Sequence, residues 1–279
     1  MPASSTDADE RFAFGENWRD FSRSLDASRI DSARDGIARL LGTGDLSGQT
    51  FLDVGSGSGL MSLAAHRMGA HVTAFDYDPD SVSTSAAVRD AHAGSDAYQV
   101  MQGSALDEDF VRSLGTFDIV YSWGVLHHTG DLWRACEIVA DAVAPGGRLA
   151  LAIYNDQGLP SRVWTRVKKA YVEGGPARRR ALVGVYSGYF SARRGVALAL
   201  AARHGGTVLR EERQGAASRN RGMDRRHDLV DWVGGYPFEV AKPEEVFRFF
   251  RSRGFDLVEL TTCAGSLGCN EFAFRRSPA

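Results

Sequence analysis

The sequence predicts an α/β fold in which a mostly parallel, doubly wound sheet is covered by helices on both faces. Two observations carry this prediction. Short apolar runs alternate with helical patterns over residues 50–154, and a glycine-rich turn follows the first of these runs. Strands that are separated by single helices form right-handed crossover units, and such units build a parallel sheet.

The N-terminal part of the chain is polar and then becomes helical. Residues 11–25 interleave aromatic and charged side chains, which is typical of a short lid. Apolar residues then recur at helical spacing over residues 30–41, and Gly42 is expected to end that helix.

Five strands with intervening helices follow. The predicted strands are 50–54, 71–75, 98–101, 117–122 and 148–154, and the predicted helices are 60–68, 81–92 and 132–143. Asp80 is in position to cap the helix 81–92. A helix over 243–250 and strands at 256–261 and 271–275 are expected to complete the sheet.

Residues 155–241 lack this strand rhythm. They contain basic helical stretches with bulky side chains, and they are too long for a plain loop, so we expect an inserted helical cap. Residues 155–228 hold 16 Lys and Arg against 6 Asp and Glu, a balance of +10, whereas the rest of the chain carries −12. The formal net charge of −2 therefore hides two oppositely charged regions.

Composition excludes several classes of protein. The longest apolar run, 196–202, is far shorter than the ~20 residues of a membrane helix, and residues 1–10 do not resemble a signal peptide. Three cysteines without a C-x-x-C pair favour reduced, buried thiols over a disulfide framework or a zinc site. We therefore expect a cytoplasmic protein without a membrane span.

The glycine-rich turn is the first motif that carries chemistry. Asp53 precedes a G-x-G-x-G pattern at Gly55, Gly57 and Gly59, which differs from the G-x-G-x-x-G of dinucleotide-binding proteins. Glycine lets the backbone turn tightly and approach a ligand closely. A carboxylate beside the turn would repel a pyrophosphate but would hold a cationic amino group, so the ligand is expected to have an amino acid end.

A second carboxylate, Asp76, ends the second predicted strand 21 residues after Gly55. This is close to the spacing of ~20 at which an acidic residue meets ribose hydroxyls in such folds. Two acceptor oxygens match two vicinal hydroxyl donors. The alternative is that Asp76 only helps the chain to turn.

These features together resemble class I S-adenosylmethionine-dependent methyltransferases. The resemblance rests on the run 51–59, on Asp76, on residues 117–128 after the fourth strand and on the Pro145-Gly146-Gly147 turn. The sequence looks most similar to ubiquinone-pathway O-methyltransferases and related bacterial small-molecule methyltransferases. The resemblance implies a seven-stranded Rossmann-like sheet with an antiparallel last strand.

It also implies a set of residues that bind S-adenosylmethionine. Asp53 and the turn would cradle the methionine part, Asp76 would bind the ribose, Tyr77 would flank the adenine, and Trp18 would close over the site. The full cofactor set is Trp18, Asp53, Gly55, Ser56, Gly57, Gly59, Asp76, Tyr77, Ser104, Ala105, Ser122 and Trp123. The product would be S-adenosylhomocysteine.

The resulting division of the chain has four parts. Residues 1–26 form an N-terminal lid segment, and residues 27–154 form the cofactor-binding core. Residues 155–241 form the substrate cap, and residues 242–279 form the helix and strand pair that complete the sheet.

Three histidines are candidate bases for a hydroxyl acceptor. His127 and His128 follow the fourth strand, at the edge where open α/β sheets bind ligands, and a histidine can accept a proton near neutral pH. His128 is the favoured candidate, and the alternative is that both residues only begin a loop. His227 with Asp228 in the cap is a candidate substrate-side base or metal pair, and a solvated charged loop is the competing interpretation. No spacing predicts a metal ion.

The predicted activity is methyl transfer to an oxygen of a small molecule, which would be phenolic, a sugar or a related natural product. The cap arginines Arg178–Arg180, Arg193–Arg194 and those at 219–226 favour an anionic acceptor or peripheral contact with anionic lipid. Nucleic acid is disfavoured, since no RNA-binding signature is present. An RNA-modifying methyltransferase and a non-catalytic cofactor-binding protein remain as alternatives.

Overall fold

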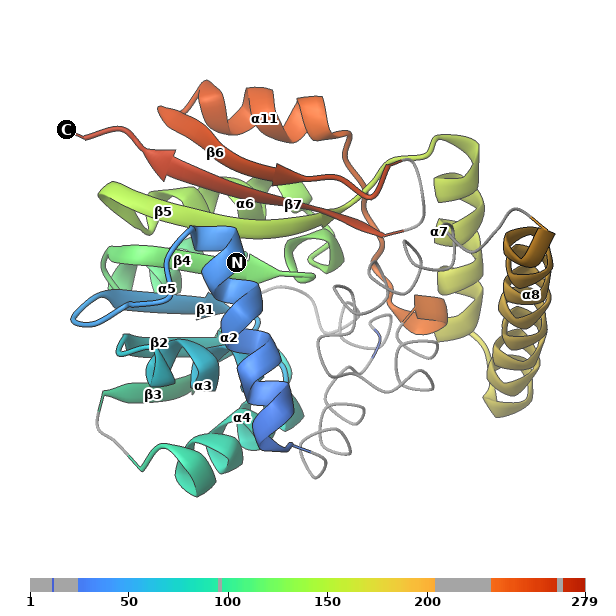
Figure 1. Cartoon of the computed structure of the whole chain (residues 1–279), viewed down its shortest axis with the longest axis horizontal. Coiled ribbons are helices and arrows are strands. Elements are labelled where there is room, and N and C mark those ends of the chain that lie inside the picture. The colour runs from blue at the N-terminus through green and yellow to red at the C-terminus, as the bar shows by residue number, and fades with distance from the viewer. Residues whose placement is uncertain (1–11, 13–24, 95–96, 204–231, 265–267, 279) are drawn as a thin grey trace.

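The computed structural model describes residue 12 and residues 25–94, 97–203, 232–264 and 268–278 (Figure 1). Trp18, His227 and the arginines at 219–226 lie outside these ranges. The described elements are α2 (Ala27–Leu41), β1 (Thr50–Val54), α3 (Leu60–Arg67), β2 (His71–Asp76), α4 (Pro79–His92), β3 (Tyr98–Gln102), α5 (Glu108–Ser113), β4 (Phe117–Trp123), the short 3-10 helix η1 (Leu126–His128), α6 (Leu132–Asp141), β5 (Val143–Tyr154), α7 (Leu159–Val172), α8 (Pro176–Arg203), α11 (Pro243–Arg251), β6 (Phe255–Thr261) and β7 (Cys269–Arg276).

Seven strands form one sheet in the order β3-β2-β1-β4-β5-β7-β6. The strands β1 to β5 pair in parallel, and β7 runs antiparallel to both β5 and β6. The predicted doubly wound, mostly parallel sheet with an antiparallel last strand is therefore confirmed. The strand order reverses between β1 and β4, and ligands of open α/β sheets bind at the carboxyl ends of the strands at such a switch point.

Helices cover both faces of this sheet, as Figure 1 shows. The helices α2, α3 and α4 bury one apolar cluster with Phe51 and Leu63, and α5, α6 and α11 bury the other with Val139 and Phe250. Each cluster is nearly free of solvent, so burial of apolar area holds both layers to the sheet.

Helix ends follow local chemistry. Asp26 caps α2 by accepting a hydrogen bond from the Arg29 amide, and Gly42 ends that helix at φ +70°, as predicted. The prediction that Asp80 caps α4 is wrong. The helix begins at Pro79, and the Asp78 carboxylate accepts from the Asp80 amide, because proline suits the first helical position.

Two further boundaries differ from the prediction. The helix predicted for 132–143 ends at Asp141, and β5 begins at Val143 rather than at Arg148, so the Pro-Gly-Gly sequence lies within the strand. The pairing of β4 with β5 has a register irregularity between Phe117 and Ile119, which accommodates the Pro-Gly-Gly sequence.

No disulfide bond joins the three cysteines. Only Cys136 is buried, and Cys263 and Cys269 are half-buried.

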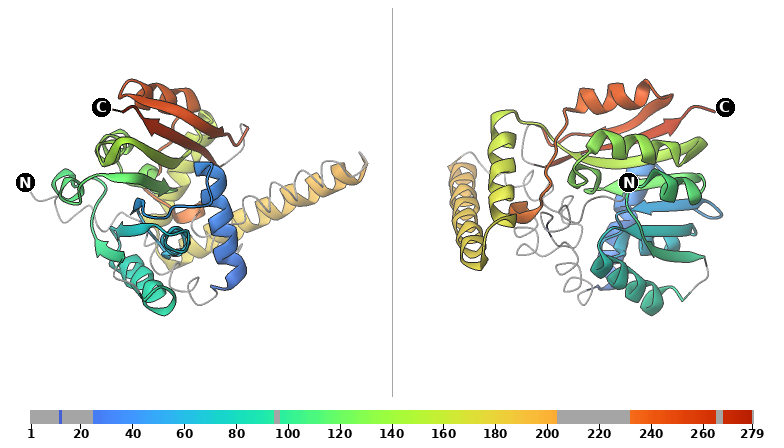
Figure 2. Two further views of the ribbon diagram at one scale, coloured as in Figure 1. Left: turned by 60° about the vertical axis from the view of Figure 1, so that its left-hand side comes forward. Right: turned by 180° about the vertical axis from the view of Figure 1, so that it is seen from behind.

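The cap contains α7 and α8, which pack on one another beside the carboxyl edge of the sheet. Figure 2 shows that α8 extends away from the body of the molecule. The buried face of α7 carries Ser161, Trp164, Lys168, Tyr171 and Val172. A separate small apolar cluster joins Tyr171 and Val172 to Val233, so the cap has a core of its own.

Candidate active site

The glycine-rich turn connects β1 to α3 at the carboxyl edge of the sheet. The amides of Gly55 and Ser56 both donate to the Phe75 carbonyl oxygen, at 2.9 and 3.1 Å, and the Gly59 amide donates to the Ser56 carbonyl oxygen at 2.8 Å. Gly55, Gly57 and Gly59 all have positive φ. Only glycine adopts this backbone readily, which explains the spacing of the motif.

Asp76 joins the end of β2 to this turn. One carboxylate oxygen accepts from the Gly57 amide at 2.9 Å, and the other accepts from the Asp78 amide at 3.0 Å. Each carboxylate oxygen can accept more than one hydrogen bond. Asp76 is therefore held in a fixed orientation beside the turn while it keeps acceptor capacity for a ligand.

Asp53 lies deeper, at 2% exposure, and one of its oxygens accepts from the Ser62 hydroxyl at 2.5 Å. Burial raises the pKa of Asp53 to about 7, and the charge of Asp76 raises it further, although the Ser62 hydroxyl opposes this. Burial also raises the pKa of Asp76 to about 6. Two carboxylates of raised pKa beside one turn form a site that favours a cationic ligand.

These pKa values predict how the stability of the unliganded chain depends on pH. An unfolded aspartate titrates near 3.8, so between about pH 4 and pH 7 the folded state holds protons that the unfolded chain releases. The contribution of these two aspartates to the free energy of unfolding should therefore fall as the pH rises through this window, by on the order of a few kcal/mol, whereas the lowered pKa values of His127 and His128 act in the opposite direction. Urea unfolding at pH 5 and pH 8 isolates the aspartate contribution, because the free energy of unfolding of Asp53→Asn should change more positively with pH than that of the control. An equal slope in Asp53→Asn and in the exposed control Asp90→Asn would contradict the assignment.

The turn packs closely against the loop after β4 and holds one orphaned hydroxyl. A Cβ atom added at Gly55 would lie 2.4 Å from Val125 Cγ1, so the turn and this loop approach as closely as a glycine allows. The Ser56 hydroxyl is buried and has no hydrogen-bond partner within the described ranges. A buried polar atom of this kind normally has a partner, and a cofactor such as S-adenosylmethionine along the turn would supply one.

The remaining predicted cofactor residues differ in exposure and in their hydrogen-bond partners within the protein. Tyr77 is exposed next to Asp76, and Ala105 is buried while the Ser104 hydroxyl accepts from the Leu106 amide. The Ser122 hydroxyl donates to the Val54 carbonyl oxygen, and Trp123 donates to the Glu271 carboxylate. The structure thus gives Ser122 and Trp123 protein partners, and their contact with a cofactor stays a prediction.

His127 and His128 follow β4 at the same edge. The Pro237 carbonyl oxygen lies 2.6 Å from His128 Nδ1, so this nitrogen donates the hydrogen bond and Nε2 carries the lone pair of the neutral ring. Burial, followed by the charge of Lys168, lowers the pKa of His128 to about 3. Burial, His128 and Lys168 lower the pKa of His127 well below its usual value. Both rings are therefore neutral at physiological pH.

Sequence reasoning missed the residues that surround these histidines. The ammonium of Lys168, which is 0% exposed, lies 4.7 Å from the ring centroids of Trp232 and Phe238 and 5.8 Å from that of Tyr154. It also donates to the Trp232 carbonyl oxygen. We call Tyr154, Trp232 and Phe238 the aromatic box. The sequence held one indication that Lys168 is buried: it lies four residues after Trp164, which places both on the same, buried face of α7.

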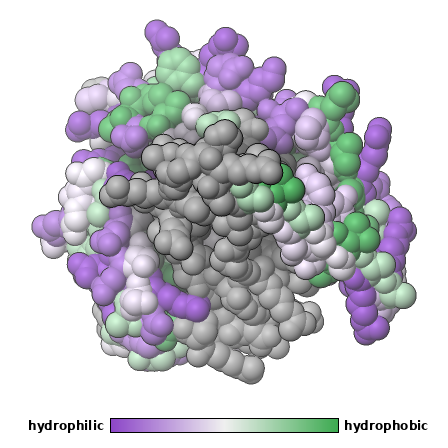
Figure 3. Space-filling view, turned by 45° about the vertical axis from the view of Figure 1, so that its right-hand side comes forward, coloured by the Kyte–Doolittle hydropathy of each residue, from purple (hydrophilic) through white to green (hydrophobic). Residues whose placement is uncertain are grey.

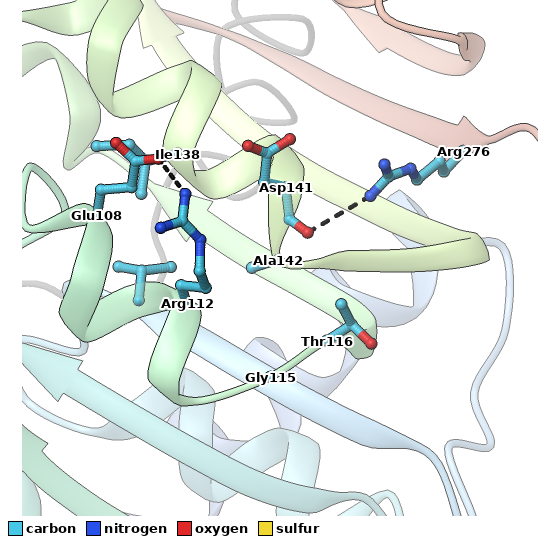
Figure 4. A pocket seen from close by; sticks show the side chains of 9 residues that line it. Glu108, Arg112, Gly115, Thr116, Ile138, Asp141, Ala142 and Arg276 are labelled. Atoms are coloured by element: carbon cyan, nitrogen blue, oxygen red, sulfur yellow. Dashed lines mark hydrogen bonds and ion pairs between the residues drawn. The ribbon is translucent and has the colours of Figure 1, made fainter.

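A hollow of about 360 Å³ lies elsewhere on the molecule (Figure 4). Thr116 and Ala142 in its lining immediately precede β4 and β5, so the hollow is at the amino edge of the sheet, opposite the glycine turn. In Figure 4, Arg112 is joined to Glu108 and Arg276 to the Asp141 backbone. The first contact lies within α5 and the second ties α6 to β7, and the hollow has no place in the candidate site.

The outer surface of the cap is partly apolar. Leu159, Val163, Val185 and Tyr189 are all more than half exposed, and Figure 3 shows apolar and charged side chains close together on the cap side. Arg178–Arg180 are exposed on α8, but Arg179 donates to the Tyr171 and Val172 carbonyl oxygens at the end of α7. This arginine therefore stabilises the cap.

The described ranges lack two kinds of feature. They contain no group of three or more His, Cys, Asp or Glu residues that could hold a metal ion. None of the helices in the described part of the chain is long and apolar enough to cross a membrane.

Residues 52–149 match the family model described as a methyltransferase domain. The match covers about a third of the chain, from β1 into β5. The fold of the chain is similar to that of a magnesium protoporphyrin IX methyltransferase from Synechocystis with bound SAH, at a TM-score of 0.51 and 15% identity over 89% of this chain and 83% of that chain. It also agrees with an O-methyltransferase family protein from Burkholderia thailandensis, at a TM-score of 0.54 and 14% identity over 99% and 62% of the two chains.

Curated relatives match part of the chain in sequence. The ubiquinone biosynthesis O-methyltransferase of Caulobacter vibrioides is 32% identical over 136 residues, which are 48% of this chain and 50% of the relative. The protein of the same name from Xanthomonas oryzae pv. oryzae is 36% identical over 112 residues, which are 40% of this chain and 45% of the relative. The chain thus spans about half the length of the curated relatives it matches, and the cap residues Lys168 and Trp232 are not part of the matched family model.

Proposed function

We propose that this protein is an S-adenosylmethionine-dependent methyltransferase that methylates an oxygen atom of a small molecule. The observation that carries the proposal is the hydrogen bond from the Gly57 amide to Asp76 at the end of β2, beside a turn whose buried Ser56 hydroxyl has no hydrogen-bond partner among the described residues. The sequence relatives named as O-methyltransferases support oxygen as the acceptor atom.

The cofactor residues act by binding and orientation. The Asp76 carboxylate accepts hydrogen bonds from the ribose hydroxyls, and Asp53 attracts the amino group of the methionine part. When bound, S-adenosylmethionine supplies a methyl group on a positively charged sulfur. The glycine turn lets the backbone approach the ligand closely, so that most of the rate comes from alignment of the two reactants and exclusion of water.

The acceptor binds at the carboxyl ends of β4 and β5, between the core and the cap. His128 Nε2 accepts the proton of the acceptor hydroxyl, and the Pro237 carbonyl fixes the tautomer that makes this possible. The low pKa of His128 makes it a weak base, so the acceptor oxygen needs a second source of stabilisation for its negative charge.

Calorimetric titration tests the cofactor assignment. We expect S-adenosylhomocysteine to bind at one site per chain and NAD not to bind, because Asp53 and the G-x-G-x-G spacing disfavour a pyrophosphate. If S-adenosylhomocysteine fails to bind at millimolar concentration, the proposed function is lost.

A further inference from the structure

A group of buried hydroxyls lies against the glycine turn, inside the layer formed by α3 and α4. The group consists of Ser62 of α3, Ser85 of α4 and Tyr98 of β3, and each of these residues is at most 2% exposed. A hydroxyl removed from water lowers stability unless it is hydrogen-bonded, and the inner face of a helix usually carries apolar side chains. The position of these hydroxyls therefore requires an explanation, which their contacts provide.

The buried hydroxyls contact the turn at both of its ends. The Ser62 hydroxyl donates to Asp53 Oδ2 at 2.5 Å, just before the turn, and the Tyr98 hydroxyl donates to the Gly59 carbonyl oxygen at 3.4 Å, where the turn ends. A Cβ added at Gly59 would lie 2.6 Å from Ser85 Oγ, so the hydroxyls and the turn are in close contact. Ser62 is the third residue of α3, and this helix follows the turn directly and fixes where the donor lies.

The Asp53 carboxylate depends on Ser62 for its hydrogen bonding. Among the described residues, it has no second side-chain donor. Ser62 is 0% exposed and Asp53 is 2% exposed, so bulk water does not reach the bond between them. A buried carboxylate becomes ionised only where donors or positive charges compensate for the water that it has lost. The Ser62 hydroxyl is such a donor.

The groups around Asp53 act on its pKa in opposite directions. Burial and the charge of Asp76 on β2 raise it to about 7, and hydrogen bonding by Ser62 lowers it. Tyr98 on β3 stays neutral, because burial raises its own pKa to about 12. The other titratable groups of this region are His66 of α3, Arg89 of α4 and Tyr121 of β4. Without the Ser62 hydroxyl, Asp53 would hold its proton at a higher pH.

We propose that Ser62 is a positioning residue that keeps Asp53 ionised for the amino group of the cofactor. This inference rests on the proposed function. The hydroxyl occupies Oδ2 from the side of α3, and Oδ1 keeps its acceptor capacity for the ligand. When the protonated amino group binds, Asp53 releases to solvent the proton that it holds at low pH. Ser62 lowers the pH at which this release takes place.

The ionisation of Asp53 in the unliganded full chain tests this role without the cofactor. Carbon-13 NMR of the aspartate carboxyl groups follows it from pH 5 to pH 9, and the Asp53 signal is the one that Asp53→Asn lacks. We expect Ser62→Ala to raise the pKa of Asp53 by about one pH unit or more, because a buried hydrogen bond to a charged group has about this effect. Ser62→Cys, whose thiol is a weaker donor, should raise it by less.

The pH dependence of S-adenosylhomocysteine binding is the second readout. Since the pKa of Asp53 is about 7 in the wild-type protein, the affinity of Ser62→Ala should be about tenfold lower at pH 6. At pH 9 the two affinities should nearly agree, because Asp53 is ionised in both proteins. A purely structural role would lower the affinity equally at the two pH values. Titration of the ligand itself affects both proteins alike.

Ser81→Ala is the matched control. Ser81 is 1% exposed, and its hydroxyl has no hydrogen-bond partner within the described ranges. The variant removes a buried hydroxyl of the same kind from α4, so the pKa of Asp53 and the pH profile of binding should stay as in the wild-type protein. If Ser62→Ala does not fold, Ser62→Cys decides, since it keeps a side chain of similar size and changes only the strength of the donor.

Three results would overturn the inference: an unchanged pKa of Asp53 in the Ser62 variants, an equal rise in Ser81→Ala, or a loss of affinity that is the same at pH 6 and pH 9. Absence of S-adenosylhomocysteine binding to the wild-type protein would instead remove the proposed function. The NMR titration distinguishes the two failures, because it reports on Ser62 and Asp53 without the ligand.

Discussion

Replacement of Asp76 by alanine is expected to weaken the binding of S-adenosylhomocysteine by about a hundredfold or more. Two effects combine. The variant loses the charge-assisted hydrogen bonds to the ribose, each of which contributes about 1.5 to 3 kcal/mol, and the Gly57 amide loses its acceptor, so the turn is less well ordered.

Calorimetry measures this effect directly. The control is Asp90→Ala, which removes the same charge from the exposed side of α4 and should leave the dissociation constant unchanged. An unchanged affinity in Asp76→Ala would show that the carboxylate serves only the local turn between β2 and α4.

Replacement of Gly55 by alanine is expected to lower the free energy of unfolding by about 2 to 5 kcal/mol and to abolish cofactor binding. The positive φ of +78° costs an L-residue about 1 to 2 kcal/mol, and overpacking of a Cβ at 2.4 Å from Val125 adds about 1 to 3 kcal/mol. The added Cβ would push the turn and the loop after β4 apart, which displaces the backbone that is expected to contact the cofactor.

Gly94→Ala provides the matched control for this prediction. Gly94 also has a positive φ, of +56°, but a Cβ there meets no atom within 4 Å. Only the backbone cost of about 1 to 2 kcal/mol should remain, with cofactor affinity intact. Urea unfolding measures the free energy of unfolding of the two variants, and calorimetry measures their cofactor affinity. Equal losses of stability would show that the contact with Val125 adds nothing to the backbone cost of Gly55→Ala.

The fold could be predicted from the sequence because its signals are local. The alternation of strands and helices and the glycine turn at Gly55 depend on neighbours in the chain. The error at Asp80 shows the limit of such signals, since two aspartates flank Pro79 and only the position of the proline decides which of them caps the helix.

The candidate site was predicted only on its cofactor side. Asp53 lies one residue before the end of β1 and Asp76 is the last residue of β2, so spacing located them. Lys168 was missed because lysine usually faces solvent, and its neighbours come from β5 and from the segment after residue 231. No local pattern brings these segments together. Their proximity depends on how the cap packs on the carboxyl edge of the sheet.

Transfer of a labelled methyl group tests the central claim most directly. The wild-type protein is incubated with methyl-labelled S-adenosylmethionine and either a filtered small-molecule extract or total RNA, with Gly55→Ala as the inactive control. The account predicts S-adenosylhomocysteine formation and label in an alkali-stable ether within the small-molecule fraction. Label found only in RNA, or no S-adenosylhomocysteine above the Gly55→Ala control with either fraction, would contradict it.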